Sequence, residues 1–161
     1  TVEDGDRIYR TQKGYVTTWY VCCADEFPNV FTFSHPAEAA FIGWYTTAAG
    51  FDGFLRWAYN SWVKEPLLDS RFRTWPAGDT YIVYPDGRSS IRFERLVEGI
   101  QDAEKIRILR ETLQEQDTPE AKVKLQQLNE LVCVFNVIER PGDLEKMLAK
   151  GKELLETFSR P

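Results

Sequence analysis

The sequence predicts an α/β fold in which parallel strands in the first half precede a helical tail. Three segments of strand length carry mostly aromatic, β-branched and small residues, and a segment of helix length separates the first two. Residues 1–84 hold 19 of the 22 aromatic residues and 17 charged residues, whereas residues 85–161 hold three and 28. The first half is therefore predicted to contain the sheet, and the second half helices with solvated charged faces.

The first two strands and the helix between them form one crossover unit. Residues 17–24, TTWYVCCA, are an unbroken run typical of a strand covered on both faces. Residues 36–49 are predicted as a helix, because Pro36 suits a first helical turn and Gly50 suits the position after its end. Residues 53–59, GFLRWAY, follow as the second strand. This order predicts a right-handed crossover between parallel strands.

The third strand is predicted at residues 79–84, DTYIVY. The loop of 19 residues before it, 60–78, has a length usual for segments that are functional or shaped around a ligand. A turn at residues 85–87 ends the strand, and Ser89 or Ser90 is expected to cap the long helix that follows.

Three helices are predicted in the second half, and the last two form a helical hairpin, the tail. The first, residues 91–116, keeps one face mostly apolar at helical spacing. Thr118 is predicted to cap a second helix that runs to Ile138, and Asp143 to cap a last helix over residues 144–158.

Charge and hydropathy exclude several classes of partner. The net charge of −5 is spread over both halves, so no basic face exists to bind nucleic acid or an anionic membrane. No apolar run approaches the roughly 18–20 residues that span a bilayer. The polar opening TVEDGDR carries no signal-peptide pattern, which is typical of a mature or excised piece.

The cysteines indicate neither disulfides nor a metal. The chain has three cysteines, Cys22, Cys23 and Cys133, and an odd number cannot all pair within one chain. Their spacing also does not match that of metal ligands. We interpret the adjacent pair as small buried hydrophobic residues. We therefore predict no metal site and no cofactor.

Candidate binding residues follow the second strand, because ligands of parallel βα folds bind at the carboxyl ends of the strands. The segment RWAYNSW, residues 56–62, combines rings that stack on the apolar face of a sugar with an amide that bonds hydroxyl groups. On a strand, Trp57 and Tyr59 share one face and Asn60 takes the other, unless the strand ends early. Carbohydrate is the predicted ligand, and aromatic packing under the long loop is the alternative.

Acidic residues offer one candidate pair. Asp25 and Glu26 come just after a predicted strand, and glycoside hydrolysis commonly uses two carboxylates near one bond. The alternative, which we favour, is that these acids cap a helix or face solvent.

Other polar residues of the first half have structural interpretations. His35 is expected to cap a helix or contact solvent rather than act as a general base. Arg71, Arg73 and Asp79 flank the WPAG segment, residues 75–78, and a buried arginine–aspartate pair would brace the long loop. The helix start after Ser90 offers N–H groups to an anion or to a capping serine, and we favour the cap.

Four strings of this sequence carry a resemblance to a known family. They are TWYVCC, RWAYNSW, WPAGDTY and RSSIRFERLVEGIQD. The chain resembles, over about residues 17–110, the C-terminal part of the catalytic domain of glycoside hydrolase family 123, also called domain of unknown function 4091. Residues 111–161 match only in being helical.

The resemblance implies a (β/α)8 barrel and β-N-acetylgalactosaminidase activity by substrate-assisted retention. In the family, an aspartate orients the acetamido group of the sugar and the adjacent glutamate protonates the leaving group, but this pair lies upstream of the similar segment. No catalytic residue is therefore expected here, and the role is not transferred to Asp25 or Glu26. The implied contributions are sugar contacts and a brace at the barrel mouth: Trp57, Tyr59, Asn60 and Trp62 for the sugar, and Arg56 with Asp79 for the brace.

With the resemblance, the chain divides into a partial barrel segment, residues 1–115, and a helical hairpin, residues 116–161, packed on the same domain. Three strands cannot close a barrel of eight strands and about 250 residues, so the open sheet edges predict self-association. The predicted function is the C-terminal part of a glycoside hydrolase, with a non-catalytic carbohydrate-binding or structural module as the alternative. The expected ligand is a glycan containing N-acetylhexosamine, and the resemblance places the parent protein outside the cell, in the periplasm or at the cell surface.

Overall fold

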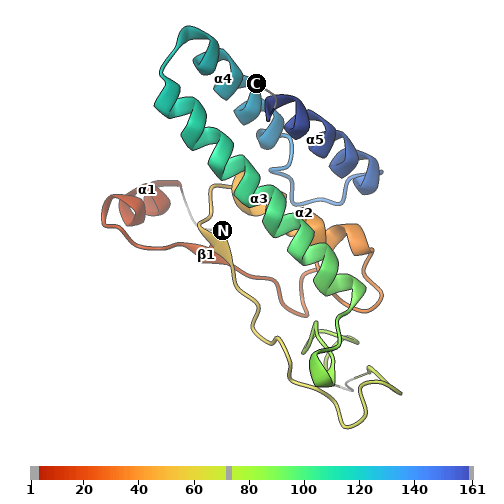
Figure 1. Ribbon diagram of the computed structural model, residues 1–161. Coiled ribbons are helices and arrows are strands. Elements are labelled where there is room, and N and C mark those ends of the chain that lie inside the picture. The colour runs from red at the N-terminus through yellow and green to blue at the C-terminus, as the bar shows by residue number, and fades with distance from the viewer. Residues whose placement is uncertain (1–3, 72–73, 160–161) are drawn as a thin grey trace.

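The computed structural model describes residues 4–71 and 74–159. Figure 1 shows a mixed α/β chain that is mostly helical, with its long helix crossing the molecule diagonally. The elements in chain order are α1 Asp4–Gln12, β1 Thr18–Trp19, α2 Pro36–Ala48, β2 Gly53–Phe54, a 3₁₀ turn Pro85–Gly87, α3 Ile91–Gln116, α4 Pro119–Cys133 and α5 Leu144–Phe158.

The sheet consists of two parallel strands, one of which precedes α2 in the sequence while the other follows it. Thr18 lies opposite Gly53 and Trp19 opposite Phe54, and the N–H of Leu55 extends the pairing by donating to Trp19 O at 2.8 Å. The prediction that these two strands are parallel and joined through a helix is confirmed.

The first strand is shorter than its sequence suggests because a side chain turns the backbone. The N–H of Cys22 donates to Asp25 Oδ2 at 2.7 Å, and the N–H of Asp25 donates to Cys22 O at 3.2 Å. These bonds close a turn where residues 20–24 were predicted to continue the strand. Cys22 and Cys23 therefore lie outside the sheet, and both are half-buried.

The third predicted strand, residues 79–84, is wrong. In the part of the chain that the structure describes, this segment makes only two isolated antiparallel bridges, from Tyr81 to Asn60 and from Tyr84 to Arg88. The reason is that side chains take the carbonyl groups that a neighbouring strand would use. Arg92 bonds Gly78 O, Arg56 bonds Asp79 O, Ser90 bonds Ile82 O and Trp62 bonds Val83 O.

Helix α1 was not predicted, and its contacts explain why. Arg7 donates to Ala49 O, while Arg10 donates to Thr17 Oγ1 at 2.9 Å and to Val16 O at 2.7 Å. Because arginine side chains rather than an apolar stripe attach this helix, hydrophobic periodicity carries little signal for it.

The remaining helices begin where the sequence predicts. His35 Nδ1 accepts from the N–H of Ala37 at 3.2 Å, so the prediction of a capping histidine is confirmed. Ser90, Thr118 and Asp143 cap α3, α4 and α5 through their side-chain oxygens, as predicted. Only α4 differs, because it ends at Cys133 rather than at Ile138.

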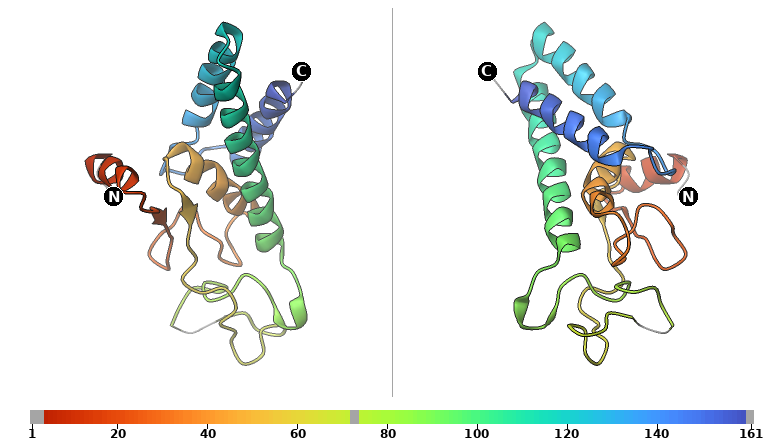
Figure 2. Two further views of the ribbon diagram at one scale, coloured as in Figure 1. Left: turned by 60° about the vertical axis from the view of Figure 1, so that its left-hand side comes forward. Right: turned by 90° about the vertical axis from the view of Figure 1, so that its right-hand side faces the viewer.

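Helix α2 is the centre of the fold, as the views of Figure 2 show. Its Trp44 ring stacks on Phe135 at 4.2 Å between ring centroids. One hydrophobic cluster joins α2 and α3 to the tail; its buried members include Phe41, Trp44, Ile106, Leu113, Leu128, Phe135, Leu148 and Leu155. The predicted boundary between residues 115 and 116 falls in the last turn of α3, whose Leu113 belongs to this shared cluster.

Helices α2 and α3 approach each other at two glycines. A Cβ added to Gly43 would lie 2.0 Å from Gly99 O, and one added to Gly99 would lie 2.3 Å from Ala40 O. The backbones are therefore in direct contact, which only glycine permits. Among the described residues, no helix is long and apolar enough to cross a membrane.

Candidate functional site

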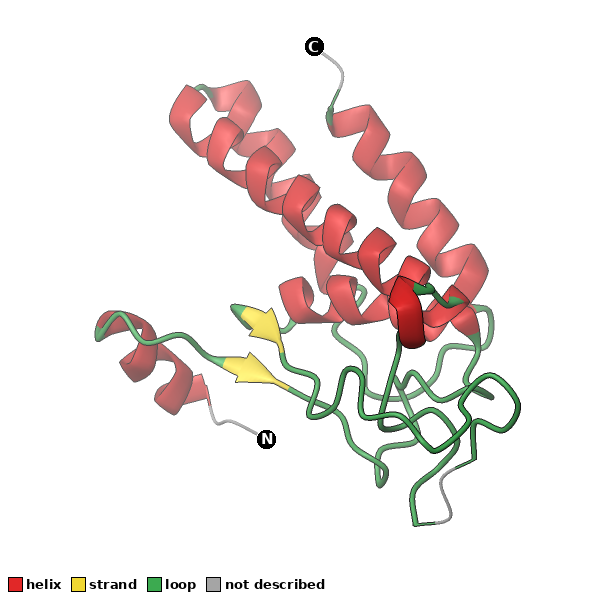
Figure 3. Ribbon diagram, turned by 60° about the horizontal axis from the view of Figure 1, so that its bottom comes forward, coloured by secondary structure: helices red, strands yellow, loops and turns green. Residues whose placement is uncertain are grey.

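The loops after β1 and β2 and the segment before α3 gather at one end of the molecule, as Figure 3 shows in green. A second hydrophobic cluster lies between these loops and the helices, with Val30, Ile42 and Ile82 buried in it. This cluster packs the loops that carry the candidate binding residues against α2 and α3.

Among the described residues between β2 and α3, four aromatic side chains are exposed, and we call them the aromatic surface: Trp57, Tyr59, Trp62 and Trp75. The first three are 46%, 46% and 42% exposed. Trp57 meets Trp75 edge to face at 5.8 Å between ring centroids, and Tyr59 meets Phe93 in the same way at 6.1 Å. Rings that are held at one edge and open on a face can stack against the apolar side of a sugar.

Backbone bonds hold the aromatic surface in place. The N–H of Ser61 donates to Thr80 O and that of Ile82 to Tyr59 O, both at 3.0 Å. Trp62 Nε1 donates to Val83 O at 2.8 Å. The segment that carries the rings and the segment before α3 therefore form one antiparallel unit.

The predicted alternation along residues 56–60 holds for its first four positions. Arg56 and Ala58 lie inward, whereas Trp57 and Tyr59 are exposed. Asn60 is exposed as well, because regular strand geometry ends at β2 and does not force it to the opposite face. The structure therefore brings all four predicted sugar contacts to the surface.

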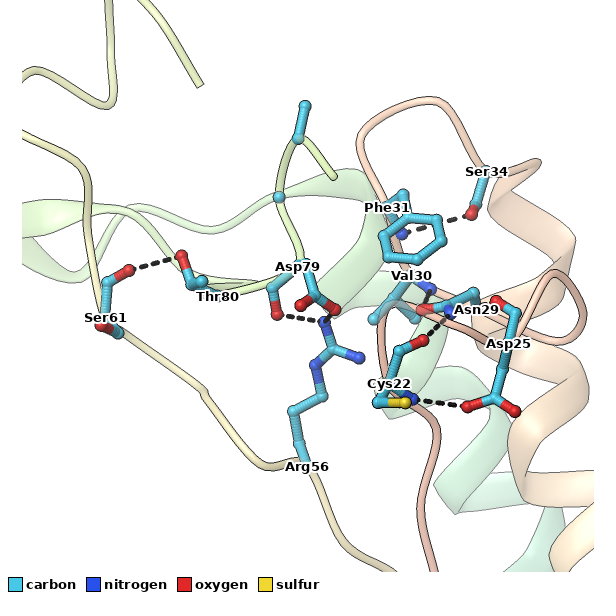
Figure 4. A network of polar contacts seen from close by, with 12 residues as sticks. Cys22, Asp25, Asn29, Val30, Phe31, Ser34, Arg56, Ser61, Asp79 and Thr80 are labelled. Atoms are coloured by element: carbon cyan, nitrogen blue, oxygen red, sulfur yellow. Dashed lines mark hydrogen bonds and ion pairs between the residues drawn. The ribbon is translucent and has the colours of Figure 1, made fainter. Parts of the chain in front are cut away.

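Arg56 and Asp79 form a buried ion pair with side chains 6% and 0% exposed. Figure 4 shows Arg56 Nη2 bonded to Asp79, to the carboxylate at 3.2 Å and to the backbone carbonyl. The predicted partner Arg71 instead binds Asp69 at the surface, at 2.7 and 2.8 Å; a brace from Arg71 is therefore wrong. Arg73 lies outside the described residues.

Arg92 is a second buried arginine, and it was not predicted as part of the site. Its Nη1 donates to Val30 O at 2.7 Å and to Gly78 O at 2.8 Å. The available signal was its position four residues before the buried Leu96, which places a charge on the inner face of α3. Burial lowers the pKa of both Arg56 and Arg92 from the ordinary value of arginine.

The acidic pair Asp25 and Glu26 lies apart from the aromatic surface. The Asp25 carboxylate bonds the backbone of Cys22 and closes a turn, and both acids are exposed. In Figure 4, Asp25 lies on one side of Arg56 and Ser61, next to the aromatic surface, on the other. The geometry gives Asp25 a structural role in a turn. No group of three or more metal-ligating side chains occurs in the described ranges.

Comparison with known proteins identifies the family. The model of the catalytic domain of glycoside hydrolase 123 matches residues 2–109. A search of curated proteins finds no match. A solved structure of a family 123 glycoside hydrolase from Clostridium perfringens, studied for glycolipid glycan hydrolysis, is 27% identical with a TM-score of 0.75.

That similarity covers 96% of this chain and 29% of the Clostridium perfringens enzyme, so the chain spans less than a third of its length. The family model stops at residue 109, whereas the structural similarity covers 96% of the chain. Most of the helical tail therefore also has a counterpart in the solved enzyme. The likeness therefore extends beyond the region in which the sequence itself is similar. The chain belongs to glycoside hydrolase family 123.

Proposed function

We propose that this chain forms the C-terminal part of a retaining β-N-acetylgalactosaminidase with a (β/α)8 barrel, and that it contributes sugar contacts without the catalytic acids. The observation that carries the proposal is the aromatic surface, which lies inside the region matched to the family's catalytic domain. Trp57, Tyr59 and Trp62 would stack on the sugar ring, and Asn60 would bond its hydroxyl or acetamido groups.

The proposed reaction explains why such contacts matter. In substrate-assisted retention, the acetamido oxygen attacks the anomeric carbon while a carboxylic acid protonates the departing glycosidic oxygen. Water then opens the cyclic intermediate and restores the acetamido group, with retention of configuration. Rings and amides that fix the sugar align the acetamido oxygen with the anomeric carbon, which lowers the entropic part of the barrier.

The substrate class we propose is a glycan that carries N-acetylgalactosamine, including glycans of glycolipids. Support comes from the enzyme of Clostridium perfringens, which was studied for glycolipid glycan hydrolysis. We further propose that the parent protein is secreted, periplasmic or exposed at the cell surface, where such glycans are encountered. The alternative function is a non-catalytic carbohydrate-binding or structural module, which uses the same aromatic surface.

An activity assay of the chain alone tests whether it lacks the catalytic acids. We expect the purified chain to release no aglycone from 4-nitrophenyl β-N-acetylgalactosaminide, because the Asp25 carboxylate is held in a turn. Release that disappears in Glu26→Gln, but persists in a control with the exposed Glu139→Gln, would restore the local pair as the catalyst.

We propose that the chain self-associates through its incomplete sheet. In the described part of the chain, β1 and β2 pair only with each other, so each leaves one edge open. Val16 and Tyr20, which flank β1, are large and exposed. Light scattering should give a mass at least twice that of the chain, and Val16→Lys should lower it whereas Val134→Lys on the tail should not. A monomer at high concentration would contradict this.

A further inference from the structure

The three buried charges behind the aromatic surface do not balance. Arg56 follows β2, Asp79 lies in the segment before α3, and Arg92 is in the first turn of α3. The side chains of Arg56 and Asp79 are 6% and 0% exposed, and Arg92 is 4% exposed. The cluster therefore holds two guanidinium groups and one carboxylate away from water.

The contacts within this cluster use only part of its hydrogen-bonding capacity. Arg56 bonds Asp79 through Nη2, and Arg92 bonds two backbone carbonyls through Nη1 and has the Tyr84 side chain as a further partner. Among the described residues, no partner exists for Arg56 Nε, Arg56 Nη1, Arg92 Nη2 or Asp79 Oδ2, although all four atoms are buried. Three nitrogen donors thus remain against one oxygen acceptor.

Physical chemistry requires compensation for such a charge. A buried lysine or histidine can lose its proton, but arginine stays protonated in proteins. Burial lowers the pKa of Arg56, the Asp79 carboxylate opposes this shift, and Arg92 lowers the pKa further as a like charge. The contact of Arg92 with the Tyr81 ring, 5.7 Å from guanidinium to ring centroid, offsets only a small part of a full charge. The missing component is a negative charge with at least two acceptor oxygens.

Ordered water is the simplest alternative occupant, since it bridges many buried polar groups. Water would bond the unpaired nitrogens, but it would leave the excess positive charge in place. A carboxylate supplies both the hydrogen-bond acceptors and the negative charge. Its two oxygens accept from a guanidinium in a bidentate arrangement.

We infer that Arg56 and Arg92 form a binding site for a second carboxylate, which joins Asp79 in a balanced four-group cluster. The carboxylate is an acidic side chain of another polypeptide segment or the carboxylate of an acidic sugar. Cys23, which is half-buried, lies near enough to Asp79 to interact with its charge. The inference does not depend on the sugar contacts proposed above.

Thermal unfolding of the whole chain tests this site, with sodium acetate as the probe and sodium chloride at equal ionic strength as the reference. Acetate should raise Tm beyond chloride, by about 5 °C or more at roughly 100 times its Kd. Arg56→Lys keeps a positive charge but removes both unpaired nitrogens, so it should abolish the acetate-specific rise. The exposed Arg88→Lys should retain it.

Two further arms complete the test. If Arg56→Lys does not fold, Arg92→Lys takes its place, because it removes the unpaired Nη2. A hexuronic acid that acts at least tenfold below the acetate concentration identifies an acidic sugar as the occupant, whereas equal or weaker action identifies a protein side chain. Equal Tm values in acetate, hexuronate and chloride for the unaltered chain would overturn the inference.

Discussion

Replacing Gly99 by alanine is expected to unfold the chain or to cost about 3 kcal/mol or more of its free energy of unfolding. The added Cβ would lie 2.3 Å from the backbone oxygen of Ala40, so α2 and α3 must separate. Separation would open the cluster around Phe41 and Trp44, in which both helices meet the tail. The midpoint of urea unfolding, followed by tryptophan fluorescence, measures the loss.

The sign of this effect is diagnostic, because alanine ordinarily favours a helix over glycine by about 1 kcal/mol. Gly5→Ala in α1 is the matched control, since nothing lies within 4 Å of its added Cβ. We expect the control to unfold at the same urea concentration as the unaltered chain or slightly above it. A Gly99→Ala midpoint at or above that of Gly5→Ala would show that the two helix backbones are not in contact.

Replacing Glu38 by glutamine is expected to lower the free energy of unfolding by about 2–3 kcal/mol. The Glu38 carboxylate is 2% exposed and accepts from the N–H of His35 at 3.1 Å, from that of Asn29 at 3.0 Å, and from Arg140. Glutamine has one acceptor oxygen, so its NH₂ group must face a donor. A drop in Tm of roughly 5–10 °C by calorimetry is expected.

The Glu38 contacts join the loop after β1, the start of α2 and the connection to α5. The exposed Glu139→Gln in that connection removes the same charge and should leave Tm unchanged. Equal Tm values for the two variants would contradict the role of Glu38 in holding the tail against the loops.

The helices could be predicted because their signals are local. His35, Ser90, Thr118 and Asp143 each bond a backbone N–H within three residues, so the sequence alone shows where α2, α3, α4 and α5 begin. The exposed rings of the aromatic surface were also found, because rings beside an amide after a predicted strand form a compact string.

The strands and the buried charges could not be predicted, because their causes are distant in sequence. Residues 79–84 have the composition of a strand, yet Arg56, Trp62 and Arg92 take the carbonyls around this segment from elsewhere in the chain. Hydrophobic periodicity does not report such bonds. The crossing of Gly43 and Gly99 is equally invisible, since it depends on the packing of two helices.

Calorimetric titration of the chain with N-acetylgalactosamine measures whether the aromatic surface binds a sugar. We expect saturable binding to the unaltered chain and a loss of about fivefold or more in Trp57→Ala and in Trp62→Ala, since a stacking ring contributes of the order of 1 kcal/mol. Tyr9→Ala removes an exposed ring on α1 and should bind as the unaltered chain does. No heat of binding to the unaltered chain, or equal affinity in all four proteins, would contradict sugar binding by the aromatic surface.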